Sequence, residues 1–219
     1  MRRFLRATGW TFIGTGAFVL YFLVYQLVGT NAVAGKGQAD LRRSMERQWV
    51  TDSGATGPAA ATRARLRPPE RVAKGRGFAV IRIPKLGVER VLVEGVDRED
   101  LRKGPGHVPS TVLPGQPGTF GVSGHRTTYG APFYRLDELR KGDEILVVTR
   151  AAVFVYAVTG TKIVRPTDIW VLDDVPGRGG RPKPTITLTT CNPRYSARQR
   201  LIVFGDLVAS RPNVTEAAA

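Results

Sequence analysis

The sequence predicts an all-β domain, either a closed barrel or a sandwich, preceded by one membrane-spanning helix. Short β-forming stretches joined by turns rich in glycine and proline recur from residue 78 onward, with little helix between them. A long uncharged stretch lies near the N-terminus. The 219-residue chain is 42% hydrophobic, which is enough for the core of one mid-sized domain.

The uncharged stretch covers residues 10–28, WTFIGTGAFVLYFLVYQLV, and is close to the roughly 20 residues that cross a bilayer as a helix. Arg2, Arg3 and Arg6 precede it, so the positive-inside rule places residues 1–9 in the cytoplasm and the rest of the chain outside. A cleaved signal peptide is the alternative, because residues 32–34 form an Ala-Val-Ala pattern. The length of the apolar stretch favours a retained anchor.

Residues 29–74 have the composition of a flexible extracytoplasmic linker, dominated by Gly, Ala, Thr, Pro and Arg. Within this segment, Leu41, Met45 and Trp49 follow one another at intervals of four residues and would share one face of a helix. That spacing predicts a short helix that docks on a protein or membrane surface, and a frayed segment is the alternative. As flexible coil, the segment would span roughly 35–40 Å, which keeps the domain near the membrane.

The domain itself is expected over residues 75–210, followed by a disordered tail at 211–219. Neither an internal repeat nor a second domain is evident in the sequence. Residues 97–106 and 133–139 are each expected to form a short helical turn. About eight short strands are expected, at residues 78–88, 89–96, 119–123, 143–150, 152–164, 170–174, 185–190 and 201–204.

The net charge of +15 favours an anionic environment, such as nucleic acid, acidic lipid headgroups or an anionic polymer. The basic residues are scattered, and the sequence has no zinc-ligand spacing or aromatic-basic RNA motif, so we expect no nucleic-acid partner. No acidic cluster resembles a calcium loop, and Asp173 and Asp174 are typical of a solvated turn. We therefore expect no metal and no cofactor.

The only cysteine, Cys191, stands where the strand expected at residues 185–190 ends. The following Asn192-Pro193 pair is a turn signal. Nearby cations favour a thiolate over a thiol, which makes this side chain a candidate nucleophile. Its alternative role is that of a small buried hydrophobic residue. Three arginines follow the turn, at positions 194, 198 and 200.

Only two histidines are available as a base. His125 follows the strand at 119–123 and a glycine, where a side chain can project into a cleft, whereas His107 lies in the turn-rich stretch GPGHVP and is expected to pack or to cap a loop. A thiol, an imidazole and a guanidinium together can carry out acyl transfer through a covalent intermediate. Because the histidine precedes the cysteine in the chain, the papain type is not favoured.

Two stretches resemble the sortase family. TLTTCNPRYSARQRLIVFG, at 187–205, resembles the sortase pattern in which a TLxTC strand end is followed by an arginine that leads into the next strand. GVSGHRTTYGAPFYRLDELRKGDEI, at 121–145, resembles the sortase histidine region. The likeness extends from residue 78 to 208 and is greatest to class E, the actinobacterial group. It implies a closed eight-stranded sortase-type β-barrel with short helical turns.

The resemblance also implies site residues. Cys191 corresponds to the nucleophile, His125 to the general acid and base, and Arg200 to the cation that stabilises the oxyanion or orients substrate. Arg198 is an open alternative if the last strand begins early enough to include it. Thr190 and Tyr129 are candidates for substrate binding, with Tyr129 in a loop, residues 127–133, that would border a peptide groove. Arg194 is expected to be a solvated loop residue.

The reaction implied by the resemblance is transpeptidation. A C-terminal sorting signal of a secreted protein, of LAxTG or LPxTG type, is cut after threonine, and an amine of a peptidoglycan precursor of the lipid II type resolves the thioacyl enzyme. Class E members favour LAxTG. This function places the protein at the cell membrane, with the N-terminus in the cytoplasm and the catalytic domain facing the cell wall.

Three alternatives remain. An L,D-transpeptidase would have histidine and glycine just before the cysteine, where Thr189 and Thr190 stand. An inactive membrane-anchored β-barrel binding module would lack a member of the Cys-His-Arg set, and all three are present. A pilus-assembly sortase would often carry a lid or a second C-terminal span. Residues 206–219 are too short and polar for a span, which favours a housekeeping role.

Overall fold

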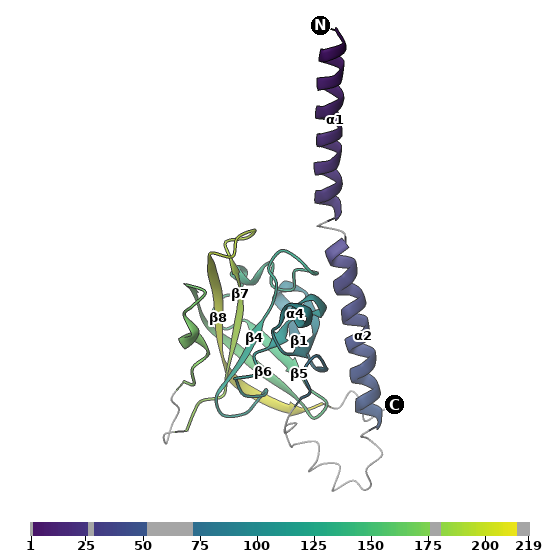
Figure 1. Ribbon diagram of the computed structural model, residues 1–219. Helices are drawn as coiled ribbons and strands as arrows, with labels where there is room; N and C mark the ends of the chain where they lie inside the picture. The colour runs from purple at the N-terminus through teal and green to yellow at the C-terminus, as the bar shows by residue number, and fades with distance from the viewer. Residues whose placement is uncertain (1, 26–28, 52–71, 176–180, 214–219) are drawn as a thin grey trace.

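A computed structural model describes residues 2–25, 29–51, 72–175 and 181–213. Two long helices precede a β-barrel, and the second helix runs alongside the barrel wall (Figure 1). Parts of three segments expected from the sequence lie outside the described residues. These are the end of the apolar stretch at 26–28, the linker at 52–71 and the tail at 214–219.

Helix α1, Arg2–Val24, contains residues 10–24 of the apolar stretch. Its segment Arg6–Val24 is long and apolar enough to cross a membrane, by length and composition, and none of it is buried. Large side chains such as Trp10, Phe12 and Phe18 are exposed. A helix with these properties is a candidate for a membrane span, and a signal sequence near the N-terminus would have the same length and composition.

Helix α2, Thr30–Thr51, corrects the expectation of a flexible linker over this part of the chain. Leu41 and Met45 are buried against the outer face of the barrel, in a cluster with Val80, Val91, Val93 and Val148. A composition dominated by Gly, Ala, Thr, Pro and Arg indicated a linker. The apolar residues of the helix nevertheless lie on one face and pack against an apolar barrel wall. The docking helix suggested by the spacing of Leu41 and Met45 is therefore present.

Polar contacts fix the register of α2 on the barrel. Gln38 Nε2 donates to the carbonyl oxygens of Val91 and Lys103 at 3.0 and 2.8 Å, and its Oε1 accepts from Val91 N at 2.8 Å. Nearby, Arg42 forms an ion pair with Glu89 at 2.9 Å. Because Gln38 uses both ends of its amide, a shift of α2 along the barrel would break several hydrogen bonds at once.

The barrel has eight strands and confirms the expected closed fold. Their order around the barrel is β1-β2-β3-β4-β7-β8-β6-β5. The pairs β2–β3 and β4–β7 are parallel and the others are antiparallel. The strands are β1 Gly77–Ile83, β2 Val88–Glu94, β3 Gly106–His107, β4 Thr119–Ser123, β5 Glu144–Val148, β6 Ala152–Val164, β7 Thr185–Asn192 and β8 Gln199–Pro212.

One predicted strand was wrong, although the number of strands was right. Residues 170–174 were expected to form a strand, but Ile169–Leu172 is the 3-10 helix η5. Val171 and Leu172 pack against Ile202 and neighbouring residues, and the Trp170 ring stacks on Phe204 at 6.5 Å. The apolar residues of this stretch thus pack against β8 without joining the barrel. The two-residue strand β3 is the eighth member instead.

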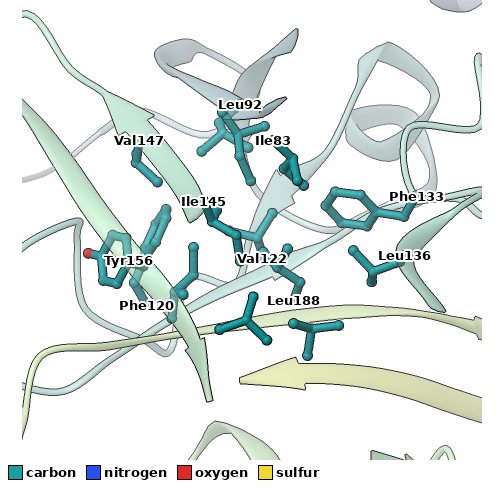
Figure 2. Packing of buried hydrophobic residues seen from close by; sticks show 14 of the residues in the cluster. Ile83, Leu92, Phe120, Val122, Phe133, Leu136, Ile145, Val147, Tyr156 and Leu188 are labelled. Carbon is teal, nitrogen blue, oxygen red and sulfur yellow. The ribbon is translucent and has the colours of Figure 1, made fainter. Parts of the chain in front are cut away.

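The expected helical turns are present as α4, Arg98–Lys103, and the 3-10 helix η4, Leu136–Glu138. A further 3-10 helix, η3, spans Pro84–Leu86. The barrel interior is filled by apolar side chains from most of the strands, among them Phe120, Ile145 and Leu188 (Figure 2). A close-packed interior of this kind holds the strand ends in fixed relative positions.

His107 packs in the protein interior, as expected from its sequence context. Its Nδ1 lies 2.7 Å from Glu94 Oε2, and its ring stacks 5.2 Å from that of Phe120. Thr111 Oγ1 is 3.1 Å from its Nε2. Both ring nitrogens thus have partners, which suits a structural role.

Candidate active site

The ends of β4 and β7 lie side by side at one end of the barrel. The two strands pair in parallel, with Ser123 opposite Thr189, and Gly124 N donates to Thr189 O at 3.0 Å. Parallel neighbours leave a sheet at the same edge. His125, just after β4, and Cys191, near the end of β7, therefore share one end of the barrel.

Thr190 and Gly124 join these two strand ends. Thr190 is 2% exposed, and its Oγ1 donates to Gly124 O at 2.8 Å. Gly124 also permits close packing of the loop, because a Cβ at this position would lie 2.6 Å from Phe133 Cδ2. Phe133 N in turn donates to His125 O at 3.2 Å. The residue before His125 must therefore be small, and the backbone around it is held on both sides.

The His125 imidazole is partly buried. Its Nε2 is inaccessible to solvent and has no hydrogen-bond partner among the described residues. Burial lowers the pKa of His125, because the charged imidazolium loses hydration. The ring lies 5.0 Å from that of Tyr129. At neutral pH this histidine is largely the free base and is able to accept a proton.

Cys191 faces Arg200 across the β7–β8 pair. Directly opposed residues project to the same side of a sheet, with Cβ atoms about 4.5–5.5 Å apart. β8 begins at Gln199, so Arg198 precedes the strand and is exposed. Arg200 Nη1 donates to the carbonyl oxygens of Ala197 and Gln199 at 2.9 and 3.0 Å. The register thus favours Arg200 over Arg198 as the partner of the cysteine.

The loop after His125 has an unusual backbone. Tyr129, Gly130 and Ala131 all have positive φ values, of 52°, 74° and 40°. Consecutive left-handed residues are costly unless other contacts hold them. Asn31 of α2 provides one such contact, since its Oδ1 accepts from Gly130 N at 2.9 Å.

The Tyr129 side chain connects this loop to α4. Arg102 Nε donates to its hydroxyl at 3.2 Å, and the Arg102 guanidinium carbon lies 5.7 Å from its ring centroid. Tyr129 also lines a cavity of about 650 Å³, whose other lining residues include Gln38 of α2 and Lys103 of α4. A role of Tyr129 in substrate binding stays a prediction.

Sequence reasoning missed two residues that link the histidine and cysteine loops. Arg126 is 4% exposed, and its Nη1 donates to Asn192 Oδ1 at 2.7 Å and to Cys191 O at 3.3 Å. Asp137 forms an ion pair with Arg126 Nη2 at 3.1 Å. The sequence offered one signal, which was the position of Arg126 directly after His125. This signal was weak, because an arginine in a polar loop usually has a solvated side chain.

Arg194 is more constrained than the expected solvated residue. Its Nη2 donates to both carboxylate oxygens of Asp137, at 3.0 and 3.1 Å, and its guanidinium carbon lies 4.5 Å from the Tyr134 ring centroid. Burial opposes ionisation of Asp137, but hydrogen bonding to its own backbone and the charges of Arg126 and Arg194 outweigh it. The pKa of Asp137 is therefore below its usual range.

Among the described residues, no group of three or more His, Cys, Asp or Glu side chains is placed to hold a metal ion. The residues at this end of the barrel include a cysteine, a histidine and an arginine, at positions 191, 125 and 200. A thiol supplies a nucleophile, an imidazole transfers protons, and a guanidinium stabilises negative charge on oxygen. Such a set can carry out acyl transfer.

Comparisons with known proteins agree on one family. A family model described as the sortase domain matches residues 81–208. Sortase SrtE1 of Streptomyces coelicolor is 35% identical over 217 residues, which cover 94% of this chain and 58% of that protein. Sortase SrtE2 of the same organism is 31% identical, covering 90% of this chain and 79% of that protein.

Solved structures give the same result. Sortase E from Streptomyces avermitilis is 40% identical with a TM-score of 0.59, covering 68% of this chain and 97% of that chain. Sortase E1 from Streptomyces coelicolor, solved with a tripeptide in its active site, is 36% identical with a TM-score of 0.60. The match covers 66% of this chain and 96% of that one.

Proposed function

This chain belongs to the sortase family, and we propose that it is a membrane-anchored cysteine transpeptidase. Its similarity to sortases of the E type is consistent with class E of that family. The observation that carries the proposal is the parallel β4–β7 pair, which leaves His125 and Cys191 at one barrel end with Arg200 opposite the cysteine. The full-length Streptomyces coelicolor relative is longer than the part this chain matches, so family membership alone does not settle the substrate.

In the first half of the reaction, the Cys191 thiolate attacks the carbonyl carbon of the threonine in a sorting signal. Formation of the C–S bond gives a tetrahedral adduct with a negatively charged oxygen. His125 takes up the thiol proton and passes it to the departing glycine amine, and the C–N bond breaks as the adduct collapses. Arg200 stabilises the negative charge on the carbonyl oxygen during the attack. The product is a thioacyl enzyme with the threonine carbonyl bound to sulfur.

In the second half, a primary amine attacks the thioacyl carbon. Neutral His125 accepts the proton of the incoming amine and returns it to the departing thiolate. The lowered pKa of His125 suits this step, because only the neutral imidazole can act as a base. The C–S bond is replaced by an amide, and Cys191 is free for the next cycle.

The substrate we propose is a secreted protein with a C-terminal signal of the LAxTG type, with LPxTG as the related alternative. The tripeptide bound in the active site of the Streptomyces coelicolor sortase E1 structure supports a peptide ligand for this fold. Thr190 and Tyr129 are proposed to contact the signal. Thr190 would act through its backbone, because its hydroxyl is already engaged with Gly124.

The acceptor we propose is the amine of a membrane-linked peptidoglycan precursor of the lipid II type. Helix α2 begins at Thr30, six positions after α1 ends at Val24, and Asn31 of α2 already contacts the loop that follows His125. The loop between β7 and β8 and the start of α2 lie toward the same end of the molecule, from which α1 extends (Figure 1). With α1 in the membrane and the N-terminus in the cytoplasm, the reacting groups would face the outer membrane surface.

The test uses the full-length chain in detergent micelles with LAxTG and LPxTG peptides, and with triglycine or a diaminopimelate derivative as the amine. Mass spectrometry should detect a transfer product cut after threonine, and the Cys191→Ala variant should form none. Hydrolysis without transfer would support the nucleophile but contradict the acceptors tested. No cleavage of either peptide by the folded protein would favour the binding-module alternative.

A further inference from the structure

The buried side chain of Arg126 is unexplained by the Cys-His-Arg set. Only 4% of the residue is exposed, and arginine is rarely buried to this degree unless its charge is paired. The residue stands directly after His125 in the sequence. A buried cation one residue from the proposed base is therefore placed to influence the site.

Arg126 connects three separate parts of the chain. Its Nη1 bonds the β7 end at the carbonyl of Cys191 and the amide oxygen of Asn192, at 3.3 and 2.7 Å. Its Nη2 pairs with Asp137, which lies in η4, at 3.1 Å. The planar guanidinium reaches these partners in different directions at once, which a lysine ammonium on a flexible stem cannot reproduce.

Asp137 extends the connection to the loop after Cys191. The same carboxylate accepts both of the Arg194 contacts, at 3.0 and 3.1 Å, so Arg126 and Arg194 share one counterion. A buried charge that loses its partner is strongly destabilised, because it keeps the desolvation penalty without the compensating attraction. The charge network thus resists separation of the histidine loop from the cysteine loop.

We propose that Arg126 is a positioning residue that fixes the Cys191 backbone relative to His125, through its hydrogen bonds to Cys191 O and Asn192 Oδ1 and its ion pair with Asp137. This proposal rests on the proposed function, in which the thiol and the imidazole must exchange a proton. Small errors in such a geometry reduce rate much more than binding. Arg126 itself touches neither reacting atom.

The first measurement needs no peptide. Cys191 is the only cysteine, so the rate at which iodoacetamide alkylates the full-length chain in micelles reports on this thiol alone. We compare the wild type with Arg126→Lys and Arg126→Met from pH 5 to 9. Release of the Cys191 backbone in Arg126→Met should change the alkylation rate by about threefold or more, since the reactivity of a thiol depends on its surroundings.

The second measurement is the transfer reaction. Arg126→Lys should lower kcat by about tenfold or more and leave KM within about threefold, because geometry and not substrate binding is changed. The matched control is Arg135→Lys, an exposed arginine whose Glu138 partner lies only three residues away. It should match the wild type in both assays.

Asp137→Asn keeps the proposal testable if both Arg126 variants fail to fold, because the Asp137 side chain is 41% exposed. It should shift alkylation and kcat in the same direction by smaller amounts. Folded Arg126 and Asp137 variants with wild-type alkylation profiles and wild-type kcat would overturn the proposal. If the wild type transfers neither peptide yet the alkylation profiles still separate, the proposed function fails while the positioning role stands.

Discussion

The hydroxyl of Thr190 donates to the carbonyl oxygen of Gly124 at 2.8 Å and ties the end of β7 to the residue that precedes His125. The bond is buried, and it joins positions 66 residues apart in the sequence. Together with the hydrogen bond from Gly124 N to Thr189 O, it fixes the cysteine and histidine segments relative to each other within the barrel wall. The loops around the site can then vary without moving these two strand ends.

Thr190→Val should weaken this junction. Valine has nearly the same shape but leaves the Gly124 carbonyl without its buried donor, at a cost of about 1–3 kcal/mol. The melting temperature of the variant should fall, and so should its kcat, because His125 loses a fixed neighbour. Thr161→Val on the exposed part of β6 is the matched control and should alter neither. A stable Thr190→Val variant with unchanged kcat would show that the bond is dispensable.

The pKa of His125 gives a pH prediction for stability. Burial lowers its pKa in the folded state, so between that value and the ordinary 6.5 the unfolded chain binds more protons. Stability should therefore be fully present above about pH 6.5 and should decline as the pH falls through this window. His125→Asn should lose this part of the pH dependence.

Thermal unfolding of the wild type and His125→Asn at several values between pH 5 and 7.5 measures the difference in slope. His107 is common to both proteins and cancels from the comparison. Parallel stability curves for the two proteins would contradict a lowered pKa at His125.

The strand register separates the two candidate arginines. Arg200 lies opposite Cys191 in β8, whereas Arg198 precedes the strand. Arg200→Lys should reduce kcat by about 10²–10³, the loss typical of removing one donor to a developing oxyanion. Arg198→Lys should stay within a few fold of the wild type. The opposite ranking, measured on the same peptide, would reassign the cation.

Much of the fold was predictable because the strands carry their own local signals. The stretches around Ile81, Ile145 and Ile186 are rich in β-branched residues and are bounded by turn residues, and each forms a strand. The stretch at Trp170 has similar composition but forms a 3-10 helix, because its apolar side chains pack on the outside of an already closed barrel. Composition alone does not separate these two cases.

Candidate site residues could be selected from the sequence where their residue type occurs only once or twice in the chain. They could not be selected where the residue type is common. Cys191 is the only cysteine and His125 one of two histidines, so few combinations had to be considered. Arg126 is one of many basic residues, and its burial depends on Asn192 and Asp137, which come from distant parts of the chain. The extent of helix α2 was underestimated for a related reason. The spacing of Leu41 and Met45 indicated a short docking helix, but the barrel surface that covers its apolar face is not visible in its own sequence.

Docking of α2 should contribute to the stability of the barrel. Met45 is 2% exposed and packs in the cluster that includes Val80 and Val91. Met45→Ala should destabilise the folded protein by about 2–4 kcal/mol, because the substitution leaves a cavity between helix and barrel. Arg43→Ala, which removes an exposed ion pair with Asp40, is the control and should cost less than about 1 kcal/mol. Urea unfolding of the full-length variants measures both values.

A chain that starts at residue 72 tests the contribution of α2 by removing the helix altogether. It lacks all of α2 and exposes the apolar wall at Val80, Val91 and Val148, which Leu41 and Met45 otherwise cover. It should unfold at a lower urea concentration than a chain that starts at residue 29, and it should bind a dye specific for apolar surface more strongly. Because Asn31 also supports the loop at Gly130, the shorter chain should lose transfer activity even where its barrel is folded. Equal unfolding midpoints for the two chains would mean that α2 rests on the barrel without stabilising it.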